Sequence, residues 1–510
     1  MSDYESLLAR LAELGHLGHA AALLGWDQQC YMPHGGGLAR ANAMGAMSKM
    51  LHERFTDDET GRLLSNAEAE GAEEGDKEGS DKALTLRAVR RDYDKSVKLP
   101  TALVSSLARE TALAHEIWVK ARQENSYAQF APTLEKLLGL SREVADHLGH
   151  GGCRYDALLD QYEPGMTTEQ VASVFAEVRD GLLPLMEIIR EGEPVDNSCL
   201  KRGFDDKTQL QFAEYIAKKL GFDFEQGRQD MAVHPFCQGL HRTDVRITTR
   251  VETHWLPGAL MGTIHEAGHG MYEQGFDPKD DDTPLSGAAS LAFHESQSRL
   301  WENIIGRSRT FWNVFYPGLQ RHFPGVLADV DVHQFYRAIN HVEPSLIRVE
   351  ADEVTYCLHI FLRFELEQEL VAGTLAVKDL PEAWSAKMQS YLGITPPSDA
   401  LGCLQDVHWS GAMFGYFPTY ALGTMLSAQL FEKALTSDSA IEPGLVRGDY
   451  APLLGWLRTN VHQPGRRYLP GELTERICGE PLSAKPLIRY LHSKYREIYF
   501  AERRDRKRIL

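Results

Sequence analysis

The chain has 510 residues, of which 43% are hydrophobic and 25% are charged, as in an ordinary globular protein. Its formal net charge of −18 at pH 7 argues against a nucleic-acid partner, because a general nucleic-acid binder needs a basic surface. No uninterrupted apolar run approaches the roughly 20 residues that cross a bilayer, so we expect no membrane partner. The length allows a few domains or one continuous helical body.

The cysteines and the start of the chain predict a cytoplasmic protein. The seven cysteines are scattered and form no Cys-x-x-Cys pair. Such a set is typical of reduced thiols and not of a disulfide framework or a thiolate zinc site. The first residues lack the basic and apolar regions of a secretory signal.

Helical periodicity dominates the N-terminal part of the chain. It predicts helices over residues 4–25, 38–55, 81–97, 101–123, 131–148, 167–190 and 207–220. The acidic stretch from Glu68 to Asp81 contains glycines, so we expect it to be an exposed connection. Pro184 lies inside a predicted helix and should kink it or end it early.

The pattern changes between Phe222 and Glu252. The stretches Asp230–Phe236 and Asp244–Val251 alternate in polarity and are rich in β-branched residues, which predicts a small sheet of short strands. Two interpretations of this sheet remain open. Its edge could bind an extended peptide, or it could be a purely structural hairpin.

Helices return after the sheet and continue to the C-terminal end. They are predicted over residues 260–272, 286–305, 332–339, 348–372, 380–392, 420–434, 446–460 and 486–503. No repeat of fixed period is present, which argues against a solenoid. The fold class expected from these patterns is mainly α with one small β-sheet.

The helix over residues 260–272 contains the pattern His-Glu-x-x-His. Residues four apart lie on the same face of a helix, so His265 and His269 could bind one metal ion. Glu266 lies one step round the same helix and could reach a water molecule beside that ion. The alternative is a chance pattern, with two hydrogen-bonded core histidines and a solvated glutamate. A third ligand would favour the metal site.

The predicted helix over residues 286–305 offers that third ligand. Glu295 follows His269 by 26 positions (295 − 269), with a loop between them that allows the two helices to pack antiparallel. A catalytic zinc needs three protein ligands, and a glutamate from a later helix is the gluzincin arrangement. Glu302 is a possible substitute, and His294 competes but points about 100° away from Glu295. We expect His294 to support a ligand or contact the substrate.

These two segments together resemble the carboxypeptidase Taq family of zinc metallocarboxypeptidases. Further motifs of that family follow in the family's order along nearly the whole chain. They are Trp26-Asp27-Gln28, Met32-Pro33, His234-Pro235-Phe236, Asp244-Val245-Arg246-Ile247-Thr248, Ile347-Arg348-Val349-Glu350-Ala351-Asp352 and Gly402-Cys403-Leu404-Gln405-Asp406-Val407-His408-Trp409.

The resemblance implies one metallocarboxypeptidase domain over residues 1–510 with a mainly α, neurolysin-like fold. Within it we expect an N-terminal helical lid at about 1–100, a catalytic body at about 101–510, a deep substrate groove and a small sheet beside the zinc helix. The resemblance also implies a homodimer and one zinc ion per chain, which cobalt can replace. The implied reaction releases single C-terminal amino acids from peptides with a free C terminus.

The metal ligands expected from the motifs are His265, His269 and Glu295, with Glu266 as general acid and base. A carboxypeptidase must also bind the α-carboxylate of its substrate, for which the bidentate guanidinium of arginine is suited. Arg348 is the expected clamp, because it lies in a motif of the family. A salt bridge from Arg348 to Glu350, Asp352 or another carboxylate is the alternative, and Arg246 is the second candidate.

Other motif residues are expected to surround the substrate. His408 and Tyr420, with Tyr416 as the alternative to Tyr420, are candidates for contacts with the oxyanion or the carboxylate. His234 is expected in the groove wall, in a structural or a substrate-binding role. Asp406 is expected to orient a histidine.

Two other functions remain compatible with the sequence. A zinc oligopeptidase of similar helical fold would cut internal bonds of short peptides. A helical binding or scaffold protein would carry an incidental or inactive site. Recognition of a free C-terminal carboxylate separates the carboxypeptidase from the oligopeptidase, and metal binding separates both from the scaffold.

Overall fold

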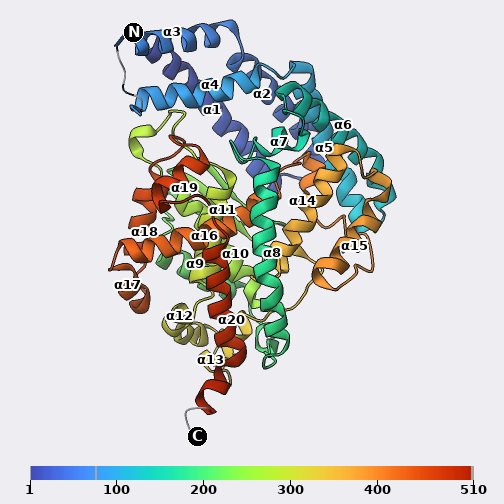
Figure 1. The fold of residues 1–510 in the computed structure, drawn as a ribbon, viewed down its shortest axis with the longest axis vertical. Helices are drawn as coiled ribbons and strands as arrows, with labels where there is room; N and C mark the ends of the chain where they lie inside the picture. Colours follow the sequence, from blue (N-terminus) through green and yellow to red (C-terminus); the bar gives the residue numbers. More distant parts are fainter. Residues whose placement is uncertain (1, 75–76, 78, 507–510) are drawn as a thin grey trace.

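The computed structural model describes residues 2–74, 77 and 79–506, and helices make up most of it (Figure 1). The mainly α fold class that the sequence predicts is confirmed. The N-terminal helices are α1 (Asp3–Cys30), α2 (Gly37–Phe55), α3 (Asp58–Glu74), α4 (Asp81–Ser96), α5 (Thr101–Gln123), α6 (Tyr127–Leu148), α7 (Arg154–Leu159), α8 (Thr168–Arg190) and α9 (Asp206–Leu220).

The remaining helices begin with the one that carries the His-Glu-x-x-His pattern. They are α10 (Leu256–Glu273), α11 (Leu291–Arg299), α12 (Arg309–His322), α13 (Val332–Ile339), α14 (Tyr356–Ala372), α15 (Leu380–Leu392), α16 (Pro418–Ser437), α17 (Ile441–Arg447), α18 (Ala451–Leu457), α19 (Pro470–Cys478) and α20 (Lys485–Arg506). Short turns of other helical types join them, of which η4 (Leu300–Ile305), a π-helix, η5 (Arg348–Glu350) and η7 (His408–Gly411) carry motif residues.

The small sheet lies against α10, as the family resemblance implies. Its strands are β1 (Gly227–Met231), β2 (Cys237–His241) and β3 (Asp244–Thr249), in the order β1-β3-β2. β3 pairs in parallel with β1 and antiparallel with β2, so the sheet is more than a hairpin. The predicted strand over residues 230–236 is wrong beyond Met231. Pro235 has no N–H to donate to a ladder, and the chain crosses to β2 in an irregular segment.

Part of one predicted connection and one predicted early helix end are wrong. α3 continues to Glu74, because Ala67 and its neighbours are buried against other N-terminal helices; the rest of the expected connection includes residues outside the described ones. α8 runs through Pro184 to Arg190. Leu182 and Leu185 are 1% and 0% exposed, and this burial outweighs the backbone hydrogen bond that proline removes.

Two predicted helices are divided in the structure. Arg348 lies in the short turn η5, and α14 begins only at Tyr356, after Asp352 accepts hydrogen bonds from the N–H groups of Val354 and Thr355. The predicted helix over 446–460 is split between α17 and α18. Gly448, with φ of 74°, ends α17 in the left-handed conformation that glycine adopts without strain.

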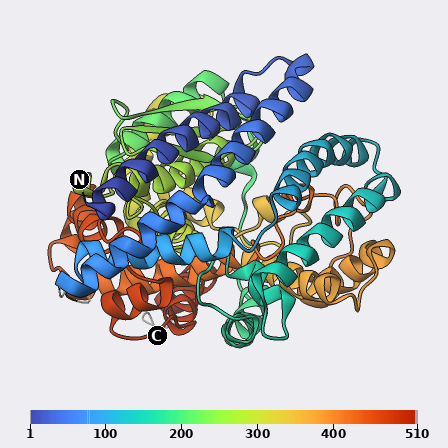
Figure 2. The same cartoon turned by 90° about the horizontal axis from the view of Figure 1, so that it is seen from above.

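The N-terminal helices have a small core of their own. Its buried side chains come from α1, α3 and α4 and are Leu7, Leu63, Leu64, Ala67, Leu86 and Val89. The large core of the described chain takes its members from Leu99 onward. Figure 1 shows α1 to α4 gathered at the top, with the C-terminal end of α20 at the opposite end, and Figure 2 looks onto these blue helices from above. Helices α1 to α4 therefore form an N-terminal layer, in which α1, α3 and α4 share this core and α2 packs against both α1 and α5.

Two further features concern the environment of the chain. None of the helices in the described part has both the length and the apolar character needed to cross a membrane. All seven cysteines lie in the described part, and all are free thiols. Cys199, Cys357 and Cys403 are buried.

Candidate metal centre and substrate site

Helix α10 presents the His-Glu-x-x-His pattern from a fixed orientation. Pro257 stands in its first turn, where the missing N–H costs nothing. One side of the helix is an apolar stripe that is at most 3% exposed, formed by Leu260, Met261, Ile264, Ala267 and Met271. Burial of this stripe sets the rotation of the helix, and His265 and His269 then face α11.

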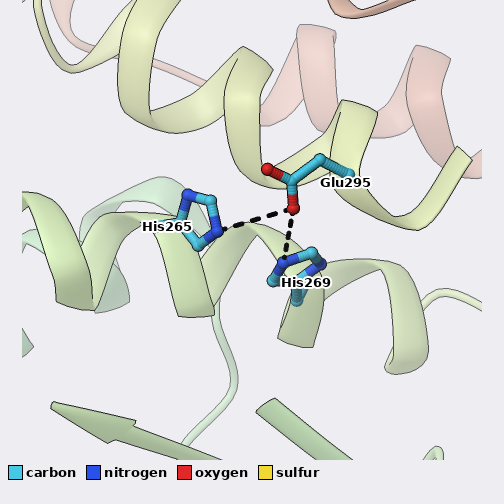
Figure 3. A group of neighbouring side chains, drawn as sticks. All are labelled: His265, His269 and Glu295. Atoms are coloured by element: carbon cyan, nitrogen blue, oxygen red, sulfur yellow. Dashed lines mark ion pairs between the residues drawn. The ribbon is translucent and has the colours of Figure 1, made fainter. Parts of the chain in front are cut away.

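The side chains of His265, His269 and Glu295 converge on one point (Figure 3). Glu295 Oε2 lies 3.6 Å from His265 Nε2 and 3.3 Å from His269 Nε2. One ligand atom from each residue lies within 4.8 Å of the others. Among the described residues, this is the group of histidine, cysteine and acidic side chains that could hold a metal ion.

Two glycines allow the helices to come this close. A Cβ at Gly268 of α10 would lie 2.7 Å from the Cα of Ser298 and 2.8 Å from the carbonyl oxygen of Gln297. A Cβ at Gly423 of α16 would lie 2.7 Å from the Cβ of Glu295. The backbones of α10, α11 and α16 therefore meet where a larger residue would separate them.

Glu295 is held as an anion. Burial by itself would raise the pKa of its carboxyl group, but Arg299 and the two histidines hold this pKa far below its usual range. Arg299 Nε donates to Glu295 Oε1 at 2.6 Å, and its guanidinium lies 3.9 Å from the ring centroid of Tyr356. The other oxygen, Oε2, is the one that faces the histidines.

His265 is oriented by a second carboxylate. Its Nδ1 lies 2.8 Å from Glu302 Oε2, and Arg307 donates to Glu302 Oε1 at 3.1 Å. Burial lowers the pKa of His265, but Glu295 and Glu302 outweigh it and raise this pKa above the usual value. Glu302, which the sequence left open as a substitute ligand, thus lies on the far side of the His265 ring.

His294 has both ring nitrogens engaged. Its Nδ1 lies 2.5 Å from His269 Nδ1, and its Nε2 lies 2.7 Å from Glu273 Oε1. His294 therefore lies on the Nδ1 side of His269, away from the ligand group. This position is compatible with the expected role of supporting a ligand.

Glu266 lies beside the ligand group in a protected position. It is 5% exposed, and burial raises the pKa of its carboxyl group to about 7, with Glu295 and Glu302 adding to the rise and His265 opposing it. A carboxyl group whose pKa lies near neutrality is suited to accepting and returning a proton.

Arg348 is buried in an ionic cluster. It is 3% exposed, its Nε donates to Asp406 Oδ1 at 2.9 Å, and its Nη1 donates to the hydroxyl of Tyr356 at 3.1 Å. Arg363 Nε donates to the other oxygen of Asp406 at 2.7 Å. The salt-bridge alternative for Arg348 is therefore present, with Asp406 as the carboxylate. The sequence predicted that Asp406 orients a histidine, but in the structure it binds two arginines. The Nδ1 of His408 lies 4.0 Å from Asp406 Oδ1. Guanidinium groups form stronger, charge-assisted hydrogen bonds with a buried carboxylate than a neutral imidazole does.

His408 and Tyr420 form a pair near this cluster. His408 Nε2 lies 2.8 Å from the hydroxyl of Tyr420, whose ring centroid lies 4.7 Å from the Arg348 guanidinium. Burial, together with the charge of Arg348, lowers the pKa of His408 to about 3, so its ring is neutral. Tyr416 lies next to both, with ring centroids 5.3 Å from each of them.

His234 and Arg246 differ in what surrounds them. His234 is exposed to solvent, yet surrounding protein and the charge of Arg348 lower its pKa to about 4. Arg246 donates to Asp244 Oδ1 at 2.9 Å, and its guanidinium lies 4.3 Å from the ring centroid of Trp26 on α1.

Several side chains of this site were not singled out by the sequence motifs, among them Arg299, Arg307 and Glu273. Helical spacing was a signal for two of them, because Arg299 follows Glu295 by four residues and Glu273 follows His269 by four. Arg307 had no such signal, since it reaches Glu302 from beyond the end of the π-helix.

Comparisons with known proteins identify the relatives of this chain. The family model described as carboxypeptidase Taq (M32) metallopeptidase matches residues 6–495. Thermostable carboxypeptidase 1 of Thermus thermophilus is 41% identical over an alignment of 506 residues, which covers 97% of this chain and 99% of that relative. Carboxypeptidase 1 of Bacillus subtilis is 38% identical over 490 residues, which are 96% of this chain and 97% of that relative.

Solved structures show the same relationship in three dimensions. The crystal structure of an M32 carboxypeptidase from Deinococcus radiodurans R1 superposes with a TM-score of 0.92 at 41% identity, covering 98% of this chain and 99% of that one. A carboxypeptidase from Pyrococcus furiosus gives a TM-score of 0.92 at 35% identity, covering 97% and 99%. The chain belongs to the carboxypeptidase Taq (M32) family of metallopeptidases and is a metallocarboxypeptidase.

Proposed function

We propose that His265, His269 and Glu295 together hold one zinc ion, which cobalt can replace. The observation that carries this proposal is the convergence of two imidazoles and one carboxylate within 4.8 Å. Two histidines and a glutamate are a common catalytic zinc set that leaves one position open. Both Nε2 atoms face Glu295 Oε2, and Glu302 accepts from the opposite nitrogen of His265, so the donors fit a divalent ion.

Glu266 is the general acid and base of the proposed reaction. When bound, the metal ion acts as a Lewis acid that polarises the scissile carbonyl and makes a water molecule more acidic. The Glu266 carboxylate accepts the proton of the attacking water and then donates it to the departing amine. Its pKa of about 7 suits both directions of transfer.

Arg348 is the proposed clamp for the substrate's α-carboxylate, with His408 and Tyr420 beside it. Asp406 and Tyr356 occupy some of the N–H groups of Arg348, and the others stay available. Asp406 also fixes the plane of the guanidinium, which reduces the entropy lost on binding. Arg246 is a weaker candidate, because Asp244 and Trp26 engage its guanidinium. His234 contributes to the wall of the proposed deep groove.

The remaining proposals concern the whole chain. We propose a single domain in which helices within residues 1–100 act as a lid over the catalytic body, and the separate core of α1, α3 and α4 supports this division. We also propose a cytoplasmic homodimer. The free cysteines support the location, and exposed Leu38 and Met50 on α2, which has no buried residue, offer an apolar surface for a partner.

Mass spectrometry of the products from one peptide tests this function. The peptide is supplied with a free C terminus and with a C-terminal amide, with and without a chelator. We expect stepwise loss of single C-terminal residues from the free acid, little cleavage of the amide, and no cleavage with chelator. The relatives do not favour the oligopeptidase alternative, which requires equal cleavage of acid and amide at internal bonds. In Arg348→Ala, discrimination between acid and amide should fall, and unchanged kinetics would exclude the clamp.

A further inference from the structure

Glu273, in the last turn of α10, lies at the end of a hydrogen-bonded line that reaches the metal ligands. His294 Nε2 is 2.7 Å from Glu273 Oε1, and His294 Nδ1 is 2.5 Å from His269 Nδ1. The rings of His269 and His294 lie 4.5 Å apart between centroids, tilted by 30°. The hydrogen bonds therefore connect the Glu273 carboxylate, through the imidazole of His294, to the ligand His269.

The chemistry of the carboxylate sets the direction of every hydrogen bond in this line. An ionised carboxylate only accepts, so His294 Nε2 must donate to Glu273. The Nδ1 of a neutral His294 then carries a lone pair and accepts from His269 Nδ1–H. His269 is left with its lone pair on Nε2, the atom that lies 3.3 Å from Glu295 Oε2. The hydrogen bonds thus assign the tautomer of His269.

We propose that Glu273 is a positioning residue for the metal centre, acting through His294 to hold His269 in the tautomer whose Nε2 lone pair faces the ion. This inference rests on the proposed function, in which His269 is a ligand. Without Glu273, the donor and acceptor of the hydrogen bond between His294 and His269 can exchange roles. His294 Nδ1 would then donate to His269, and a hydrogen would occupy the Nε2 that must bind the metal.

The packing around Glu273 is a second observation that points the same way. A Cβ at Gly239 of β2 would lie 2.7 Å from the Glu273 Cδ and would also collide with its Oε2. The strand thus carries no side chain where it crosses the carboxylate. Glu273 is confined between β2 and His294, which keeps its carboxylate within reach of the His294 ring.

The other histidine ligand provides an internal comparison. His265 Nδ1 meets Glu302 directly at 2.8 Å, without an intervening imidazole. The two histidines are therefore oriented by separate carboxylates, one direct and one relayed. Because the two carboxylates act on different ligands, their removal should weaken metal binding independently.

The test is metal affinity of the full-length protein, measured by chelator competition with zinc and with cobalt. Glu273→Gln should weaken binding by about 10- to 100-fold, the usual cost of losing a group that orients a ligand. The glutamine amide can donate a hydrogen bond to His294 Nε2, which a carboxylate cannot. This variant therefore permits His294 Nδ1 to donate to His269, and metal binding should weaken. The visible absorption spectrum of the cobalt form should also change. Glu225→Gln, at an exposed position before β1, is the matched control and should bind like the parent chain.

A double-mutant cycle separates a relay from a merely structural role. His294→Asn should weaken binding by itself, and adding Glu273→Gln should then cost little more, since the relay is already cut. Equal loss from Glu273→Gln in both backgrounds would overturn the proposal, as would parent-like affinity of Glu273→Gln. Thermal unfolding of the metal-free variants checks the fold. If the parent chain and His265→Ala bound metal equally, the proposed metal site would fail instead.

Discussion

At the scale of single residues, the metal centre is defined by what surrounds each charge. Glu266 and Glu295 are both buried carboxylates, with exposures of 5% and 4%. Arg299 donates to Glu295 and keeps it ionised, whereas Glu266 lies close to two other carboxylates and burial raises its pKa to about 7. Glu295 is therefore charged, as a metal ligand must be, whereas Glu266 has a pKa that suits a group that carries a proton.

Glu266→Gln should retain the metal and lose nearly all turnover. The amide has almost the same shape as the carboxylate but cannot accept the proton of water. General acid–base catalysis of this kind contributes about 10²- to 10⁴-fold, so kcat should fall by about that factor. Steady-state kinetics and metal analysis of the same samples measure both quantities. Glu295→Ala is the contrasting variant, in which metal affinity should fall; substantial turnover by Glu266→Gln would remove Glu266 from the mechanism.

At the scale of helices, the site depends on close packing of α10 against α11. Gly268 lies where the two backbones meet. Ser290 caps α11 at its N-terminus, and the buried carboxyl group of Glu163 accepts from the N–H of Ala292 at 2.5 Å. The N-terminal turn of α11, which leads to Glu295, is therefore fixed by two side chains.

Gly268→Ala should damage both stability and metal binding. The new methyl group would meet backbone atoms of Ser298 and Gln297, which cannot rotate away, and overpacking of this kind costs about 1–3 kcal/mol. Gly262→Ala on the same helix is the control, because its Cβ would meet only Thr249 Oγ1, at an ordinary 3.7 Å. Chemical denaturation and chelator competition should show losses in the first variant alone. Equal behaviour of the two variants would contradict the close approach.

Glu163 should make the stability of the chain depend on pH. Burial raises the pKa of this carboxyl group from its ordinary 4.5 to about 8 in the folded chain. Between these values the folded chain keeps a proton that the unfolded chain releases, so stability falls as pH rises from 4.5 to about 8. The loss is on the order of a few kcal/mol. Glu163→Gln lacks this titration, so denaturant unfolding at pH 5 and pH 8 should differ less in the variant, and parallel changes in both proteins would refute the assignment.

At the scale of the whole molecule, the N-terminal layer is attached by packing of α2 against α5 and of α1 against β2, and by ion pairs. Arg87 lies 3.0 Å from Glu472, and Arg466 lies 2.7 Å from Asp92. Exposed ion pairs of this kind each contribute little. Trp26 adds a buried contact, since it is 6% exposed and lies under the guanidinium of Arg246. This ring on α1 therefore joins the N-terminal layer to the small sheet.

Trp26→Ala should loosen the N-terminal layer while the body stays folded. The substitution removes a buried ring and its cation–π contacts with Arg246 and Arg228, at 4.3 and 5.4 Å. Amide hydrogen exchange should become faster in α1 and α2 and stay unchanged in α10 and α11. Exchange that rises evenly over the whole chain would contradict an attachment localised at this residue. Leu23→Ala serves as the control, because this leucine lies on α1 and is 39% exposed.

The sequence alone determined the features that depend on neighbours along the chain. Periodicity located helices such as α5, predicted at its observed bounds, and the spacing of His265 and His269 placed both on one face of α10. Ordered motifs indicated the family before any contact was known. These features follow from helical geometry, which a short segment already contains.

Only the tertiary structure decided which distant groups meet. It placed Glu295 in the ligand group and Glu302 behind His265, and it paired Arg348 with Asp406. It also revealed Glu273 at the end of the His294 line. The physical reason is that such contacts depend on how closely and at what angle separate elements pack. Gly239, Gly268 and Gly423 allow close packing, but which atoms each glycine meets is known only from the folded chain.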